Sequence, residues 1–392
     1  MNAWKRNKQI IPLPYSYYFF TVAVILLIGF FDSVYLALSH YKLYTDIGYQ
    51  SFCAISRAFN CDTVSQSPYS ILFGVPVAVW GIFGYAFSLV LLIFAWPKQA
   101  ERKRIWTLLL IISLCFTLYS LFLAVISTYK IHSYCIMCIL SYGVNLLLLY
   151  FTWLIRKRFK CEPVFKAFVN DFRYLLIRAR VSIPAASFFC VGVLFLLLFF
   201  PAYWELTPPA LSKKIPTGIT ENGHPWIGAE NPELVIVEFT DYRCFQCKKM
   251  HFYLRELIAS NPGKIRLVHR HFPMDHTINP IVDQPFHQGA AKLALISIFA
   301  EQKGRFWKMN DILFDMSGET KGINIRDLAK RADIPFKELK HIFQDKTLWK
   351  KLRKDISAGL EYGLTGTPGF IIEGEAYVGR IPAEILRKYG EF

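Results

Sequence analysis

Two pairs of cysteines in this sequence have a spacing suited to thiol–disulfide chemistry. Cys135 and Cys138 stand at the start of an apolar run that reaches about Ile155, and Cys244 and Cys247 follow a run rich in β-branched residues. At positions i and i+3 of a helix, two sulfur atoms lie on one face and close enough to form a disulfide. In a membrane segment, the first pair could exchange electrons with a lipid-soluble carrier. The alternative is a set of buried, inert cysteines, which apolar helices often contain.

The second pair is accompanied by the residues that a redox site needs. Cys244 is expected at the N-terminus of a helix, where free N–H groups and the helix dipole favour a thiolate, and Cys247 would resolve the mixed disulfide. Glu238, on the preceding strand, is predicted to be a buried carboxylate that assists proton transfer to Cys247, unless it faces outward. Thr367-Pro368 fits a cis-proline loop that packs against the pair and binds substrate backbone, although an ordinary turn proline is the alternative.

A zinc site is the main alternative for this C-x-x-C pair. A four-thiolate site would need a second cysteine pair in the same domain, and no cysteine follows Cys247 in the sequence. We therefore predict no metal.

Five apolar runs are long enough to cross a membrane. They cover residues about 17–39, 69–96, 105–129, 135–155 and 181–203. The formal net charge is +16, and residues 1–208 hold 18 Lys and Arg against 7 Asp and Glu, so that most of the excess lies beside these runs. Charge in this arrangement sets membrane topology, and no nucleic-acid partner is predicted.

The basic residues also predict an orientation. The N-terminus, the turn at 98–104 and the segment at 156–180 together carry 15 Lys and Arg, whereas the opposite side of the membrane carries only three. By the positive-inside rule, the N-terminus is cytoplasmic and the C-terminal half lies outside. The cysteines that this orientation gathers on the outer side are Cys53 and Cys61, in a polar loop, and Cys135 and Cys138.

The sequence divides into a membrane part and a soluble part. Residues 1–160 are predicted to form a four-helix transmembrane domain. Residues 161–208 would form a basic segment, a fifth linking helix and the start of a linker that runs to Pro225. Residues 209–392 are expected to form a soluble α/β domain outside the membrane.

The order of elements in the soluble part predicts a thioredoxin-like domain with a helical insertion. A strand at 233–240 leads to the C-x-x-C pair at a helix start, and a second strand follows at 264–270. Helices then extend from about 287 to 362. A last strand follows Thr367-Pro368, with a hairpin turn at Gly374-Glu375.

Asp32 lies within the first apolar run. A carboxylate inside a membrane is by default a functional candidate, although Asp32 is close enough to the outer end to reach water or a partner. The residues expected to be bystanders, or to have surface or packing roles, are Cys115, Cys161, Cys190, His251 and His271.

Residues about 17–155 resemble the vitamin K epoxide reductase (VKOR) family. The motifs that carry this resemblance are Cys53 and Cys61 in the first outer loop, Cys61-Asp62 at the start of a short half-helix, Ser67-Pro68-Tyr69 leading to Gly74-Val75-Pro76, Trp80, and the Cys135–Cys138 pair.

Residues about 220–392 resemble a DsbA-type member of the thioredoxin superfamily. The matching segments are His271-Phe272-Pro273-Met274-Asp275-His276 and the Thr367-Pro368 loop. The whole chain is similar to bacterial fusions of VKOR with a thioredoxin-like partner. The Phe-Gln dipeptide between Cys244 and Cys247 departs from the Pro-His or Pro-Tyr that is frequent in DsbA-type proteins, which leaves the redox potential of this pair open.

The resemblance implies an electron path. Cys244–Cys247 oxidises a substrate dithiol, and the loop pair Cys53–Cys61 reoxidises it through a mixed disulfide between Cys244 and Cys53. Cys61 then exchanges with Cys135, which frees Cys138 to pass electrons to a bound quinone, either ubiquinone or menaquinone. The candidate residues for the quinone site are Cys138, Trp80, Ser67 and Asp62, although Trp80 fits equally well as an interfacial anchor.

The leading hypothesis is therefore a quinone-dependent thiol oxidase that forms disulfides in exported proteins. It would lie in a bacterial inner membrane, in contact with lipid and the quinone pool, with its thioredoxin-like domain in the periplasm or at the cell exterior. A first alternative reverses the electron flow and makes the soluble domain a disulfide reductase or isomerase, but the sequence has no flavin or nicotinamide motif to feed that route. A second alternative is a membrane-tethered binding protein with structural cysteines. The presence of three redox-capable cysteine pairs in one chain argues against it.

Overall fold

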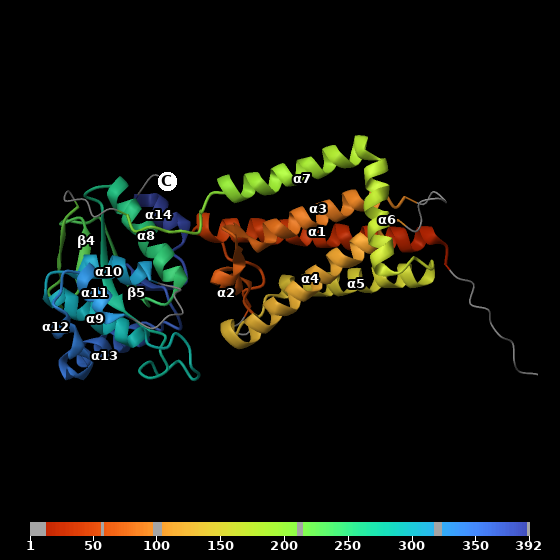
Figure 1. Cartoon of the computed structure of the whole chain (residues 1–392). Coiled ribbons are helices and arrows are strands. Elements are labelled where there is room, and N and C mark those ends of the chain that lie inside the picture. Colours follow the sequence, from red (N-terminus) through yellow and green to blue (C-terminus); the bar gives the residue numbers. More distant parts are fainter. Residues whose placement is uncertain (1–12, 56–58, 97–103, 210–214, 317–323, 390–392) are drawn as a thin grey trace, which may run out of the picture. The chain divides into compact units, whose positions relative to one another are not determined.

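The computed structural model describes residues 13–55, 59–96, 104–209, 215–316 and 324–389. The chain forms two compact units. One contains the residues up to Leu43 and Gln50–Ala202, and the other contains Tyr44–Tyr49 and Tyr203–Phe392. Within the described ranges, the first unit is helical apart from one short hairpin, and the second contains a six-stranded sheet (Figure 1).

Long apolar helices make up most of the first unit. Four stretches are long and apolar enough to cross a membrane, namely Tyr15–Thr45, Trp106–Ile131, Ile136–Arg158 and Ala179–Phe199. They correspond to α1, to α4 (Trp106–Ile126) with the π-helical turn η2 (Ser127–Ile131), to α5 and to α7. The remaining apolar helix, α3 (Val77–Ile93), has 17 residues. At 1.5 Å per residue it is about 25 Å long, somewhat less than the hydrocarbon thickness.

The predicted second span differs from the structure at its start. Pro68–Ser70 forms a 3-10 turn (η1), and Ile71–Leu72 (β1) pairs with Val75–Pro76 (β2), so α3 begins only at Val77. Pro76 is the physical reason. A proline inside a helix removes a backbone hydrogen bond and clashes with the preceding turn, whereas a proline just before the first turn is tolerated.

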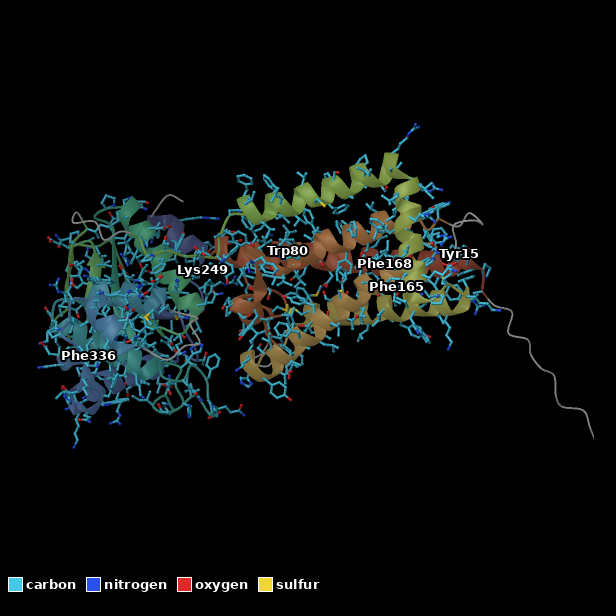
Figure 2. The ribbon with its side chains drawn as sticks, viewed as in Figure 1. Tyr15, Trp80, Phe165, Phe168, Lys249 and Phe336 are labelled. Atoms are coloured by element: carbon cyan, nitrogen blue, oxygen red, sulfur yellow. A yellow bond between two sulfur atoms is a disulfide. The ribbon has the colours of Figure 1, made fainter. Side chains whose placement is uncertain are left out.

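A helix that the sequence analysis did not assign occupies the basic segment between α5 and α7. This helix, α6 (Val164–Ile177), crosses the end of the other helices of the unit (Figure 1). Asp171 anchors it, because its buried Oδ2 accepts a hydrogen bond of 3.1 Å from Thr107 N in the first turn of α4. Phe165 and Phe168 project from α6 and are exposed (Figure 2). The amphipathic pattern of its sequence could have predicted this helix.

The second unit is built on a mixed sheet with the strand order β3-β4-β6-β5-β7-β8. The strands are β3 (Thr217–Ile219), β4 (Pro225–Gly228), β5 (Leu234–Thr240), β6 (Ile265–His271), β7 (Gly369–Ile372) and β8 (Glu375–Val378). The central strands β5 and β6 run parallel, and their neighbours pair with them in antiparallel orientation. Together with the apolar helices of the first unit, this sheet gives the multidomain architecture that the sequence predicts.

Helices cover both faces of this sheet. They are α8 (Phe245–Ser260), α9 (Ala290–Gln302), α10 (Phe306–Asp315), α11 (Ile325–Arg331), α12 (Phe336–Lys340), α13 (Lys346–Glu361) and α14 (Ala383–Tyr389), with a 3-10 turn η3 (Ile342–Gln344). Side chains alternate along β5. Leu234 and Ile236 pack with α8 on one face, and Phe239 packs into the α9 and α13 cluster on the other.

Two details of the soluble part differ from the sequence analysis. The linker was predicted to run to Pro225, but Thr217–Ile219 already forms β3 and pairs with β4. The hairpin turn lies at Glu373-Gly374, at φ of 51° and 88°, one residue earlier than predicted. An edge strand of three residues is too short to show a recognisable alternation of apolar and polar side chains. The hairpin turn lies at Glu373-Gly374 because both of its central residues adopt positive φ.

Candidate active site

Cys135 and Cys138 are arranged by the start of α5. Cys135 is the N-cap residue, and its sulfur accepts a hydrogen bond of 3.2 Å from the backbone N–H of Cys138. Cys135 is buried, and Cys138 is partly exposed. A sulfur at a helix N-terminus receives the unpaired N–H groups and the positive end of the dipole, which stabilise a thiolate. Local helix geometry therefore distinguishes the two sulfur atoms.

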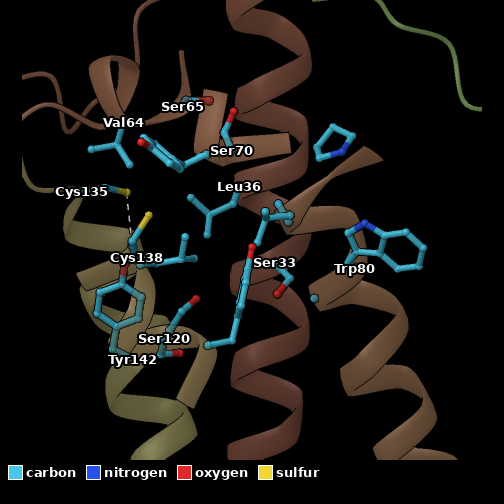
Figure 3. A pocket seen from close by; sticks show the side chains of 18 of the residues that line it. Ser33, Leu36, Val64, Ser65, Ser70, Trp80, Ser120, Cys135, Cys138 and Tyr142 are labelled. Carbon is cyan, nitrogen blue, oxygen red and sulfur yellow. Dashed lines mark hydrogen bonds between the residues drawn. The ribbon is translucent and has the colours of Figure 1, made fainter. Parts of the chain in front are cut away.

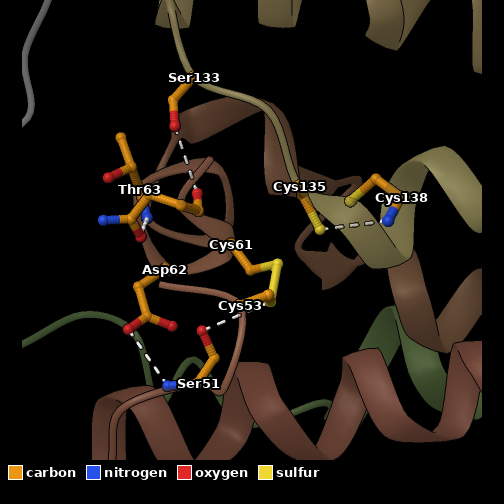
Figure 4. Close-up of a disulfide and its surroundings, with 9 residues drawn as sticks. Ser51, Cys53, Cys61, Asp62, Thr63, Ser133, Cys135 and Cys138 are labelled. Carbon is orange, nitrogen blue, oxygen red and sulfur yellow. Dashed lines mark hydrogen bonds between the residues drawn. A yellow bond between two sulfur atoms is a disulfide. The ribbon is translucent and has the colours of Figure 1, made fainter. Parts of the chain in front are cut away.

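A disulfide joins Cys53 and Cys61 in the polar loop (Figure 4). Cys61 begins the short helix α2 (Cys61–Ser65), and Asn60 caps it by accepting a hydrogen bond from Thr63 N. The loop docks on the segment before Cys135, because Asn60 N donates to Tyr134 O at 3.0 Å. Cys53, Cys61 and Cys135 consequently pack in one buried cluster.

A cavity of about 500 Å³ opens beside these cysteines (Figure 3). Of the predicted quinone-site residues, Ser67, Trp80 and Cys138 line this cavity. Asp62 does not line this cavity, so its predicted part in a quinone site gains no support from the cavity. Its buried side chain turns to the other side of α2, where Oδ2 accepts from Ser51 N at 3.3 Å, so Asp62 holds the disulfide loop.

Several polar residues of the cavity wall were not predicted. Ser141, Tyr142 and Asn145 lie on α5 at three, four and seven positions after Cys138. Asn145 also joins two further wall residues, because its Oδ1 accepts from Tyr85 at 2.7 Å and its Nδ2 donates to Ser120 at 2.9 Å. The i+3, i+4 and i+7 spacing from Cys138 was the signal that could have found them. Cys115, expected to be a bystander, also lies in this wall.

The pair in the second unit repeats the same local arrangement. Cys244 is the N-cap of α8, and its sulfur accepts from Cys247 N at 3.3 Å. The Thr367–Pro368 peptide bond is cis, and Thr367 O lies 3.5 Å from Cys244 Sγ. The fold thus brings the C-x-x-C pair together with the proline loop, which begins 120 residues after Cys247 in the chain.

Comparison with known families assigns both units. Residues 20–153 match the Vitamin K epoxide reductase family, and residues 220–389 match the Thioredoxin family. The chain joins a VKOR domain to a thioredoxin-like domain. This combination supports a thiol–disulfide oxidoreductase.

Among curated proteins, the chain is 26% identical over 159 residues to a Na(+)/H(+) antiporter NhaA 3 of Salinispora tropica and to NhaA 1 of Salinispora arenicola. The aligned stretch is 41% of this chain and 23% of each relative, so the chain spans about a quarter of the length of the curated relatives it matches.

The chain is also similar to several solved structures. They include a thioredoxin-like oxidoreductase from Silicibacter pomeroyi (21% identity, TM-score 0.37, 43% of this chain and 91% of that chain). The others are alpha-DsbA2 from Wolbachia pipientis (23%, 0.34, 42% and 84%) and the catalytic domain of ScsC from Proteus mirabilis (20%, 0.31, 42% and 87%).

An Asp–His pair in the thioredoxin-like domain is a feature that sequence reasoning missed. Asp241, three residues before Cys244, is buried, and its Oδ2 accepts from His287 Nδ1 at 2.8 Å. Burial opposes protonation of His287, but the charge of Asp241 and this hydrogen bond outweigh burial and raise the pKa of His287. Asp241 thus favours the protonated form of His287, and the positive charge of that form acts on Cys244.

The two thiols of this domain have opposite tendencies. Burial opposes ionisation of Cys244, but the hydrogen bond from Cys247 and the charge of His287 prevail and lower the pKa of the Cys244 thiol. Burial, followed by the contact with Cys244, raises the pKa of Cys247. Cys244 is thus the better attacking and leaving group, and Cys247 is suited to resolve the mixed disulfide.

Replacing His287 by glutamine is expected to raise the pKa of Cys244 and to slow its alkylation several-fold at pH values below that pKa. The measurement is the iodoacetamide rate of Cys244 against pH, followed by mass spectrometry on the full chain. His276→Gln is the matched control, because His276 is a more exposed histidine of the same domain that lies beside Asp275. An unchanged pH profile in His287→Gln would show that His287 has no electrostatic effect on the thiol.

Glu238 is buried, as predicted, but its neighbours were not anticipated. Its Oε1 accepts hydrogen bonds of 2.7 Å from Nδ1 of both His251 and His269. Asn310 Nδ2 donates to His251 Nε2, and Tyr242 donates to Asn310 Oδ1, so this order of donors makes His251 a neutral ring protonated at Nδ1. His251 therefore belongs to a buried polar network.

The electrostatics of this network favour a permanent carboxylate. Burial opposes ionisation of Glu238, but the two histidines outweigh it and lower its pKa to about 2. Burial also lowers the pKa of His251. The ligand atoms of Glu238, His251 and His269 lie within 4.8 Å of one another, a spacing at which they could hold a metal ion, and they are engaged here in hydrogen bonds to each other. His251 stands one helical turn after Cys247 on α8 and contacts the Glu238 carboxylate through Nδ1.

Proposed function

We propose that this protein is a quinone-dependent thiol oxidase that forms disulfides in exported proteins. Electrons would pass from a substrate dithiol to Cys244–Cys247, then to Cys53–Cys61, then to Cys135–Cys138, and finally to a membrane quinone. Every transfer before the last is a thiol–disulfide exchange, in which a thiolate attacks one sulfur of a disulfide and the other sulfur leaves as a thiolate. Each exchange conserves two electrons and two protons.

The observation that carries this proposal is the docking of the disulfide loop at the head of α5. The hydrogen bond from the backbone N–H of Asn60 to the carbonyl of Tyr134 holds Cys61 beside Cys135, and Cys138 borders the cavity. A disulfide, a second cysteine pair and a cavity in this order form a continuous route for electrons. Structural cysteines in a tethered binding protein would require none of these contacts.

The cavity suits a quinone in size and chemistry. Its volume falls within the range of small-molecule sites. Apolar side chains such as Phe116 and Leu123 line it together with the polar groups of Tyr142 and His40, which fits an apolar ring with two carbonyl oxygens. A quinone supplies a two-electron, two-proton acceptor. The role of this wall is then to place that acceptor next to Cys138 and to exclude water.

In the thioredoxin-like domain, Cys244 would attack and be attacked, with the Thr367–Pro368 loop presenting its backbone to the substrate. The role of Glu238 in proton transfer to Cys247 remains a prediction.

The charge distribution supports a location in a bacterial inner membrane, with a cytoplasmic N-terminus. The proposed boundaries are residues 1–160 for the VKOR domain, 161–208 for the linking region and 209–392 for a thioredoxin-like domain in the periplasm or at the cell exterior. This topology gives the thioredoxin-like domain access to exported proteins that contain cysteine thiols.

The function is tested by mixing the full-length protein in detergent with a reduced dithiol peptide and either a ubiquinone or a menaquinone analogue. Catalytic quinone reduction that is lost in Cys244→Ser establishes the oxidase and the entry point of electrons. Absence of quinone reduction in the wild type, with reduction of a disulfide peptide instead, would replace the oxidase by the reductase or isomerase.

A further inference from the structure

A buried carboxylate reaches across the VKOR domain to the helix that carries Cys138. Asp32, on α1, is 4% exposed, and its Oδ2 accepts a hydrogen bond from the hydroxyl of Ser141 on α5. Within the described part of the chain, its buried Oδ1 has no hydrogen-bond partner. An unsatisfied buried carboxylate oxygen inside a membrane costs stability, so its presence calls for a function.

The position of this carboxylate connects it to the cavity. Ser141 lines the wall and lies one turn after Cys138 on α5, and Ser33, the neighbour of Asp32 in the chain, lines it as well (Figure 3). Asp32 is thus linked to the cavity, and to the helix that carries Cys138, through the hydroxyl of Ser141.

The other ionisable groups that face this cavity are less suited to carry a proton. Besides the cysteines of the redox pairs, they are His40 on α1, Tyr69 on η1, Tyr85 on α3, Cys115 and Tyr119 on α4, and Tyr142 on α5. Tyr85 donates its hydroxyl to Asn145, and His40 lies two turns from Asp32 beside Ser70. Phenols ionise only at high pH, whereas a carboxyl can both take and release a proton near neutrality when its surroundings are apolar.

We propose that Asp32 takes up a proton when the Cys135–Cys138 pair is reduced and returns it through Ser141 when the pair is oxidised. The inference rests on the proposed function for its acceptor. In the reduced pair, the helix N-terminus favours a thiolate at Cys135. A second negative charge at Asp32 would repel that thiolate, so the proton resides on the carboxyl group.

Atoms and electrons balance in this scheme. The reduced pair comprises the Cys135 thiolate, the Cys138 thiol and the Asp32 carboxylic acid, and so holds two protons. When the bond between the two sulfur atoms forms, two electrons leave the pair. One proton leaves Cys138, and the other leaves Asp32 through the hydroxyl of Ser141. The quinone takes up both electrons and both protons as it becomes a quinol, and Asp32 returns to a carboxylate.

The first measurement needs no quinone. Infrared difference spectra of the full-length protein in detergent, recorded as the Cys135–Cys138 pair is reduced with a small dithiol, are expected to show the carbonyl band of a protonated carboxyl group. This band should disappear in Asp32→Asn. Asp171→Asn is the matched control, because Asp171 is also buried with an unpartnered Oδ1 but anchors α6 through Thr107. Absence of the band in the wild type, or its persistence in Asp32→Asn, would overturn the proposal.

The second measurement connects the proton to the reaction. Asp32→Asn is expected to lower quinone turnover about 100-fold, the usual range for loss of a general acid or base, while alkylation shows Cys135 and Cys138 accumulating as thiols. The Asp171→Asn variant should retain turnover, and the pH profile should change only in Asp32→Asn. Full turnover in Asp32→Asn contradicts the relay. A wild type that shows the infrared band but reduces no quinone would instead refute the oxidase while leaving Asp32 as the proton acceptor of the pair.

Discussion

Replacing Cys138 by serine is expected to abolish quinone reduction, whether electrons enter from a peptide dithiol or from a small dithiol such as dithiothreitol. The serine oxygen matches the sulfur in shape but can neither form a disulfide with Cys135 nor give up electrons. Cys138 is the cysteine of the α5 pair with partial exposure, and it borders the cavity. Turnover should therefore fall to the rate measured without protein.

Comparing the two electron donors distinguishes loss of Cys138 from loss of a cysteine earlier in the electron path. Cys53→Ser should block turnover only when the peptide is the donor, because a small dithiol can reduce the α5 pair directly. In Cys138→Ser, Cys135 has lost the partner that resolves a mixed disulfide, so a Cys61–Cys135 disulfide should accumulate and leave Cys53 open to alkylation. Both states are read by mass spectrometry of alkylated peptides.

Cys190→Ser is the matched control, since Cys190 is an exposed cysteine on α7. This variant should retain full turnover with either donor. Residual turnover of Cys138→Ser with dithiothreitol would contradict the proposed route, because electrons would then leave the protein by another group.

The parts of the candidate active site that could be predicted are those that depend only on residues close together in the sequence. The C-x-x-C spacing and the helix start are local, so the N-cap positions of Cys135 and Cys244 follow from the sequence alone. Apolar runs likewise predict α1, α4, α5 and α7. The start of α3 could also have been placed better, because Pro76 excludes a helix interior.

Contacts between distant segments account for most of what was missed. His287 meets Asp241 across 46 residues, and Ser141 meets Asp32 across 109. No local period encodes such pairs, because they depend on how helices and strands pack. Asp62 illustrates the converse, since it neighbours Cys61 in sequence yet faces away from the cavity. A short helix turns successive side chains by about 100°, so adjacent residues need not share a site.

Replacing Glu238 by alanine is expected to destabilise the thioredoxin-like domain by about 3 kcal/mol at pH 7. The substitution removes the acceptor of two buried imidazole N–H groups, those of His251 and His269, and leaves both donors unsatisfied. Glu238→Gln retains a carbonyl acceptor and should lose less. Hydrogen–deuterium exchange of peptides from α8 and β6, measured on the full-length protein in urea, reports the free energy of opening of this domain.

The stabilising contribution of Glu238 is expected to depend on pH in one direction. The pKa of Glu238 is lowered from 4.5 to about 2 in the folded protein, so its contribution is complete above pH 4.5 and is lost as the pH falls toward 2. The difference between wild type and Glu238→Ala should therefore stay constant from pH 7 to pH 5 and shrink only in stronger acid. Glu338→Gln, which alters a surface ion pair with Lys303, should cost less than about 1 kcal/mol.

The histidines behave differently over the same range, which separates them from the carboxylate. Burial lowers the pKa of His251 and, more strongly, of His271 below 6.5, so the unfolded chain binds protons that the folded chain does not. The stability of the wild-type domain should consequently fall as the pH drops below about 6.5, before Glu238 begins to protonate. His271→Leu should flatten this fall. If the domain were equally stable at pH 7 and pH 5, the buried histidines would have to be charged in the folded state, and Glu238 would then be held by ion pairs instead of neutral N–H donors.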